Sequence, residues 1–188
     1  MAESVVELTG VEDLPPPRDD ASIWYGKDMS ARTDWLHVLT PADNAEIEAA
    51  IRPLVNAEAD IARIAKADFP LPELGPRLAG ICNEVMTGRG FALLRGLPVE
   101  NWSMRESATA YFGIGAHFGH ARSQNGKGHV LGHVRDLGRD AVNDPSARIY
   151  QTTERQTYHT DSSDIVALLC LKTSQSGGAS ALVSSMTI

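Results

Sequence analysis

His159 and Asp161 are the residues whose types and spacing point most directly to chemistry. Side chains at positions i and i+2 of a strand point to the same side. The imidazole of His159 and the carboxylate of Asp161 can therefore reach one metal ion. Together with one more histidine they make the facial triad of non-haem Fe(II) sites, which leaves open positions for a cosubstrate and O₂.

The spacing His-x-Asp is short and also arises by chance, so its surroundings decide its weight. The alternative is a surface turn in which Asp161 caps a backbone N–H. The apolar run Ile165–Leu171 that follows predicts a strand buried on both sides, and a Ser-Gly-Gly-Ala-Ser turn at 176–180 precedes a return strand over 181–186. A polar motif at the mouth of a buried strand suits a small-molecule site in a β-barrel.

Two further histidine pairs have spacings that place both members on one face. These are His117 with His120 at a predicted helix end, and His129 with His133 on a predicted strand or loop. A cupin-like metal enzyme that uses His117, His120 or His133 as further metal ligands is therefore one hypothesis. The simpler interpretation is that these histidines face solvent or form hydrogen bonds.

The N-terminal half predicts helices. Thr40 is a candidate N-cap, Pro41 suits the first helical position, and a stripe of isoleucines and leucines follows, with Pro53 expected to kink or divide the helix. A second amphipathic helix around residues 78–85 ends at Gly88 and Gly90, and a third is expected over 102–118, with Ser103 as a candidate N-cap.

Strand patterns dominate the second half. Residues 90–96 predict a short buried strand, and further strands are expected over 129–135, 149–152, 164–171 and 181–186. Helices followed by strands indicate an α+β fold. Residues 1–22 are expected to be an extended lead, with Trp24 and Tyr25 anchoring its end to the domain that begins at residue 23.

Composition excludes several classes of protein. The formal net charge of −7 is unfavourable for binding nucleic acid or an anionic membrane, and no apolar run is long enough to span a bilayer. Cys82 and Cys170 lie in apolar segments and are expected to be small buried side chains in a reducing compartment. We therefore expect a cytoplasmic protein, and the sequence leaves homo-oligomerisation open.

Four motifs in order resemble one family. Gly90–Gly96, the helix end at Phe112–Gly119, His159-Thr160-Asp161 and the turn Ser176–Ser180 are similar to the TauD/TfdA-like Fe(II)- and 2-oxoglutarate-dependent dioxygenases, over roughly residues 80–188. The resemblance implies a double-stranded β-helix (jelly roll) behind N-terminal helices. It implies His159 and Asp161 as iron ligands, Ser180 as a residue that helps hold 2-oxoglutarate, and O₂ and a small molecule as substrates.

The chain departs from the family pattern after its metal motif. The family's second ligand histidine and its 2-oxoglutarate-binding arginine lie far downstream, whereas no histidine or arginine follows His159 here, and Lys172 is the only basic residue there. We therefore expect residues 23–188 to be the N-terminal part of such a domain, with an incomplete jelly roll and little activity alone. The alternative is a non-catalytic β-rich binding or assembly module in which His159 and Asp161 are structural.

Overall fold

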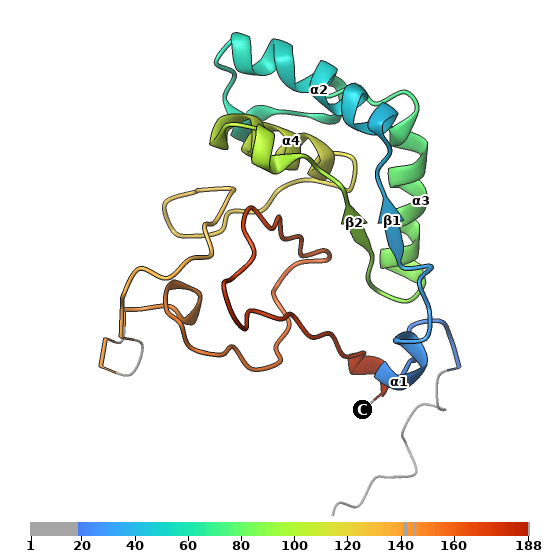
Figure 1. Cartoon of the computed structure of the whole chain (residues 1–188), viewed down its shortest axis with the longest axis vertical. Helices are drawn as coiled ribbons and strands as arrows, with labels where there is room; N and C mark the ends of the chain where they lie inside the picture. Colours follow the sequence, from blue (N-terminus) through green and yellow to red (C-terminus); the bar gives the residue numbers. More distant parts are fainter. Residues whose placement is uncertain (1–18, 141–142, 145, 188) are drawn as a thin grey trace, which may run out of the picture.

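The computed structural model describes residues 19–140, 143–144 and 146–187, and it separates into a helical layer and a long stretch without strands (Figure 1). The helices and strands, all before residue 116, are α1 (Gly26–Met29), β1 (Leu36–Val38), α2 (Pro41–Asn56), α3 (Leu74–Thr87), β2 (Leu93–Arg95) and α4 (Met104–Gly115). Short 3₁₀ helices are η2 (Ile61–Arg63), η3 (Lys66–Asp68), η4 (Val99–Asn101), η5 (Ile149–Gln151) and η6 (Ser185–Thr187).

Helix α2 begins where the sequence predicts. The Thr40 hydroxyl accepts from the Asp43 N–H at 3.2 Å, and the Asp43 carboxylate accepts from the Thr40 N–H at 2.7 Å, so a reciprocal capping box fixes the first turn. Pro53 lies inside α2, which continues to Asn56. The predicted helical stripe is therefore divided into two elements. These are α2, which includes Pro53, and the 3₁₀ helix η2, which begins at Ile61.

Helix α3 is capped by its neighbour. The Glu46 carboxylate on α2 accepts the N–H groups of Glu73 and Leu74 at 2.8 and 2.9 Å, which satisfies donors at the start of α3. Glu46 is one of the acidic residues of α2 that sequence patterns do not distinguish. Gly88 ends α3, as expected.

Helix α4 starts with a second capping box, between Ser103 and Glu106, at the predicted N-cap. It packs against α2 and η2. Gly113 allows α4 to approach the turn between η3 and α3 closely, because a Cβ at that position would lie 2.3 Å from Cδ2 of the fully buried Phe69.

The sheet is a parallel pair, with Leu36 opposite Leu93 and His37 opposite Leu94. Parallel strands need a long crossover, and α2 and α3 provide it here. Strand β2 lies inside the predicted strand 90–96. Strand β1 was not predicted, because three residues are too few to show the two-residue period of a strand.

The core lies between the helices and the sheet. Phe69, Ile47 and Leu78 are completely buried there, and Leu74 is almost completely buried. The other buried apolar members of the cluster are Leu39, Ala50, Ile51, Ile64, Leu71, Ile81, Ala110, Phe112 and Ile114.

The strands expected over 129–135, 149–152, 164–171 and 181–186 are not present in the structure. Across the described residues after Gly119 there is no strand; residues 149–151 and 185–187 form 3₁₀ turns instead. A strand is stabilised by hydrogen bonds to a neighbour, and these segments find no partner strand in the described part of the chain. The apolar run 165–171 is accordingly not buried on both sides, since Val166 is 53% and Leu168 77% exposed.

The structure confirms helices with a small sheet, and the jelly roll remains an expectation. No helix in the described ranges is long and apolar enough to cross a membrane. Both cysteines are free; Cys82 is half-buried, but Cys170 is exposed, which corrects the expectation of a buried side chain. Cys170 is exposed because the strand expected to bury it does not form. The lead 1–22 lies outside the described residues as far as residue 18.

Candidate metal and cosubstrate site

The structure brings His159 and Asp161 together. The Nε2 atom of His159 lies 3.8 Å from Oδ1 of Asp161, and both side chains are about half exposed, at 53% and 55%. The Nδ1 atom of His159 lies 2.8 Å from the carbonyl oxygen of Thr157. A carbonyl only accepts, so Nδ1 must carry the proton and donate it.

The two side chains offer donor atoms of the kinds that bind metal ions. With Nδ1 protonated, Nε2 of a neutral imidazole keeps its lone pair and faces the carboxylate oxygen. Metal-bound histidines usually donate their second nitrogen to a carbonyl or carboxylate in this manner. Two donors that each lie about 2.1 Å from one ion, at right angles as in a facial triad, are about 3.0 Å apart, so the two side chains would have to approach each other by somewhat less than about 1 Å to share an ion. The pair therefore supplies two donors of the types that suit Fe(II).

A third protein ligand does not complete the site among residues 19–140, 143–144 and 146–187, where no group of three His, Cys, Asp or Glu side chains is placed to hold a metal. The Nε2 atom of His117 instead lies 2.9 Å from the Phe69 carbonyl oxygen. This hydrogen bond joins the residues that follow α4 to the turn before α3. His129 is hydrogen-bonded to Asn125. These contacts give His117 and His129 structural roles, and the cupin-like hypothesis gains no support from the described residues.

Ser180 lies in an exposed turn. Gly177 and Gly178 precede it with φ of 67° and 69°, values that favour glycine. The Ser174 hydroxyl donates to the Gly177 carbonyl at 2.7 Å and closes the turn. The predicted Gly-Gly turn is therefore present, and Ser180 leaves it toward the final run 181–187.

The comparisons with known proteins agree with this motif order. Residues 50–188 match the model of the taurine catabolism dioxygenase TauD, TfdA family. The chain belongs to this family. The match starts forty residues before Gly90, where the first motif recognised in the sequence begins, so the family region also includes α3, β2 and α4.

Two relatives resemble most of the chain. FR-33289 synthase of Streptomyces rubellomurinus is 33% identical over 178 residues, which are 95% of this chain and 52% of the relative. The taurine hydroxylase-like protein SAT17 of Stachybotrys chartarum is 28% identical over 176 residues, 90% of this chain and 46% of the relative. The chain spans about half the length of these curated relatives.

One contact beside this TauD/TfdA motif escaped the sequence analysis. The Tyr111 hydroxyl on α4 donates to the Ala167 carbonyl at 2.5 Å, which joins the helical layer to the run after Asp161. Burial raises the pKa of Tyr111, so the hydroxyl remains a donor at neutral pH. No local signal identifies this contact, because its two residues are 56 positions apart.

Proposed function

We propose that this chain supplies His159, Asp161 and Ser180 to an Fe(II)- and 2-oxoglutarate-dependent dioxygenase that hydroxylates a C–H bond of a small molecule. In the balanced reaction, substrate, 2-oxoglutarate and O₂ give hydroxylated substrate, succinate and CO₂. The observation that carries the proposal is the 3.8 Å approach of His159 Nε2 to Asp161 Oδ1 in a chain of the TauD/TfdA family.

Each residue has a separate task in this proposal. His159 offers Nε2 while its Nδ1–H remains on the Thr157 carbonyl, which holds the ring plane and the tautomer. Asp161 offers an anionic oxygen whose charge balances that of the cation. The Ser180 hydroxyl donates to a carboxylate of 2-oxoglutarate. When bound, the iron supplies the chemistry that couples decarboxylation of 2-oxoglutarate to attack by O₂.

We further propose that the remaining groups come from outside these residues. The relatives are about twice as long as the matched region. A second ligand histidine and an arginine for the far carboxylate of 2-oxoglutarate are then expected in the rest of the family domain, of which residues 23–188 form the N-terminal part. The later strands would also pair with the apolar runs 164–171 and 181–186 and complete the jelly roll.

The substrate class is a small molecule. One relative is named a synthase and the other a hydroxylase-like protein. The two names indicate different products, so we propose neither relative's substrate for this chain. The alternative of a non-catalytic binding module is less favoured, because membership of the family and the metal-competent tautomer of His159 both support an enzyme.

Metal binding by the 188-residue chain tests the first step. We expect anaerobic Fe(II) titration to show binding that His159→Ala and Asp161→Ala each weaken at least about tenfold, since each removes one of two donors. His129→Ala is the matched control, because His129 is also exposed but is bonded to Asn125. Equal binding by wild type and His159→Ala would remove His159 from the site.

Turnover tests the second step. A protein that carries these residues within a family domain of the relatives' length should form succinate from 2-oxoglutarate with Fe(II) and O₂. His159→Ala should abolish this activity. Unchanged succinate formation in that variant would contradict the proposal.

A further inference from the structure

The final run of the chain, over residues 181–187, is hydrogen-bonded to residues 22 and 24. The Ser184 hydroxyl donates to the Ser22 carbonyl at 2.5 Å, and the Thr187 hydroxyl donates to the Trp24 carbonyl at 3.0 Å, although the partners are more than 160 residues apart. Ser184 is 7% exposed, whereas residues 171–183 before it are exposed. The long exposed stretch thus ends at a buried attachment to residues 22–24.

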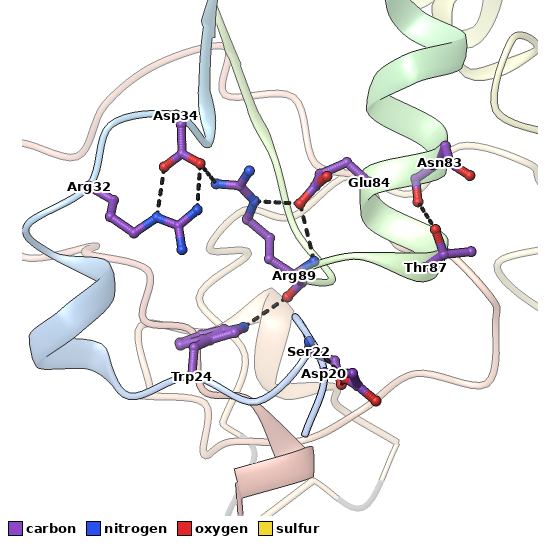
Figure 2. Close-up of polar contacts among 9 residues, drawn as sticks. All are labelled: Asp20, Ser22, Trp24, Arg32, Asp34, Asn83, Glu84, Thr87 and Arg89. Carbon is purple, nitrogen blue, oxygen red and sulfur yellow. Dashed lines mark hydrogen bonds and ion pairs between the residues drawn. The ribbon is translucent and has the colours of Figure 1, made fainter. Parts of the chain in front are cut away.

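Trp24 fixes the segment that receives these hydrogen bonds. Its indole N–H donates to the Arg89 carbonyl at 2.8 Å (Figure 2). The centre of its ring lies 5.2 Å from that of Phe91. The sequence predicted Trp24 and Tyr25 as anchors of the end of the N-terminal lead; Trp24 makes these contacts, whereas Tyr25 is 58% exposed. Segment 22–24 therefore takes its position from Arg89 and Phe91.

Arg89 is itself held firmly. Its guanidinium, with the side chain only 9% exposed, forms ion pairs at 2.9 Å with Asp34 and with Glu84 (Figure 2). Hydrogen bonds from the Arg89 backbone and guanidinium hold the pKa of Glu84 below its ordinary value, and a hydrogen bond from Arg32 does the same for the pKa of Asp34. Both carboxylates are thus anionic partners at neutral pH.

A recess of about 180 Å³ lies between Trp24, Arg89, Phe91 and residues 182–186. Small-molecule sites usually exceed about 300 Å³, so this recess is too small to be one. Residues 22 and 24 line it together with residues 182–186, and the buried Ser184 hydroxyl bonds to Ser22 there. We call this contact between segments 22–24 and 182–187 the joint.

The joint limits where Ser180 can lie. Four residues separate Ser180 from Ser184, a distance of at most about 14 Å in extended chain. On its other side, the turn closed by Ser174 fixes Gly177 and Gly178, where a Cβ at Gly178 would lie 2.4 Å from the Ser174 hydroxyl oxygen. Ser180 itself is exposed, and its range of positions is limited by the tight turn before it and by the anchored Ser184 after it.

We propose that Trp24 is a positioning residue for 2-oxoglutarate: it anchors segment 22–24 to Arg89, and this segment fixes the run 181–187 and with it the Ser180 hydroxyl. The inference rests on the function proposed above and adds a residue from the opposite end of the chain to that site. Trp24 has no contact with 2-oxoglutarate in this proposal and acts through Ser184 and Thr187.

Hydrogen exchange tests the joint without any cofactor. The amides of Met186 and Thr187 are bonded to Ser184 and report on it. We expect Trp24→Phe, which keeps an aromatic ring but removes the donor, and Ser184→Ala to make these amides exchange roughly three- to tenfold faster, the factor for one net hydrogen bond. Ser184→Thr should remain near wild type, because it keeps the hydroxyl.

Trp102→Phe is the matched control. It removes an indole N–H that donates to Glu48 in the helical layer, far from the joint in the sequence, and should leave the exchange of residues 186 and 187 unchanged. Unchanged exchange in Trp24→Phe and Ser184→Ala would overturn the inference.

Calorimetric titration of the same proteins with 2-oxoglutarate and Fe(II) under anaerobic conditions tests the link to Ser180. We expect Trp24→Phe and Ser184→Ala to weaken 2-oxoglutarate binding severalfold, with Ser184→Thr and Trp102→Phe unchanged. Normal binding in the first two variants despite faster exchange would overturn the positioning role. Absence of 2-oxoglutarate binding by the wild-type 188-residue chain, with the exchange result intact, would overturn the positioning role and leave the joint, whereas succinate formation by the longer protein tests the proposed function separately.

Discussion

The carboxylate of Asp43 joins two helices, and it is almost completely buried. It accepts from Thr40 at the start of α2 and forms an ion pair with Arg77 of α3 at 2.7 Å. Burial raises the pKa of Asp43, but the hydrogen bonds from Thr40 and Arg77 outweigh burial and hold the pKa below the ordinary value of 3.8. The anionic form of Asp43 therefore stabilises the folded state.

Asp43→Asn is expected to lower the free energy of unfolding at pH 7 by about 2 kcal/mol, because the variant loses the ion pair and part of the cap. Since the folded pKa is below the unfolded one, the contribution of Asp43 is complete above pH 3.8 and is lost as pH falls through the folded pKa. Urea unfolding at pH 7 and near pH 3 measures both values. The gap between the proteins should narrow in acid, and an unchanged gap would contradict the pKa shift. Asp164→Asn, at an exposed carboxylate, is the control.

At the site, the sequence identifies residues whose relation is local. The sequence predicted that His159 and Asp161 share one side of a strand; no strand forms there, but the two side chains lie 3.8 Å apart, and their role as metal ligands stays a prediction. The carbonyl of Thr157 is nearly as local, but backbone acceptors have no sequence signature. The Tyr111 and Trp24 contacts depend on folding and were found only in the structure, although Trp24 was expected to be an anchor.

At the scale of elements, helices were predicted more reliably than strands. Capping boxes at Thr40 and Ser103 and the stop at Gly88 are encoded within a few residues, so the starts of α2 and α4 and the end of α3 were predicted closely. Strand β1 depends on β2, more than fifty residues away, and its three residues carry too little pattern of their own.

The close packing of α4 on the turn before α3 leads to a test. Gly113→Ala is expected to destabilise the protein by about 2 kcal/mol, because its Cβ would overlap the ring of Phe69. The clash must also outweigh the better helix propensity of alanine, which is worth about 1 kcal/mol.

Gly115→Ala is the control in the same helix. A Cβ at Gly115 meets no atom within 4 Å, so this variant should be neutral or slightly more stable. Thermal unfolding of both variants measures the difference. Equal melting temperatures would show that the contact between Gly113 and Phe69 is looser than described.

At the scale of the molecule, the chain has a packed layer before residue 119 and an extended, mostly exposed stretch after it (Figure 1). Contacts of Val130 and Leu131 with the core, the Tyr111 bond and the joint at Ser184 connect the two. Apolar patterns predicted buried strands over 164–171 and 181–186, but a strand forms only with a partner, and most of these residues are exposed. The pattern therefore predicted buried strands that do not form among the described residues.

A substitution at Leu168 distinguishes the fold of the 188-residue chain from that of the proposed complete domain. It is 77% exposed, so Leu168→Ser should change the free energy of unfolding of the 188-residue chain by less than about 0.5 kcal/mol. Leu78→Ser, at a completely buried position, should cost about 3 kcal/mol or more in the same measurement.

In a protein with the relatives' length, the proposed jelly roll would bury residues 164–171 between strands. Leu168→Ser should then cost about as much as Leu78→Ser, while remaining nearly neutral in the 188-residue chain. Urea unfolding of both variants in both proteins gives the comparison. A neutral effect of Leu168→Ser in the longer protein would show that this run is not a buried strand, and the same result would remove the support that the run gives to His159 and Asp161.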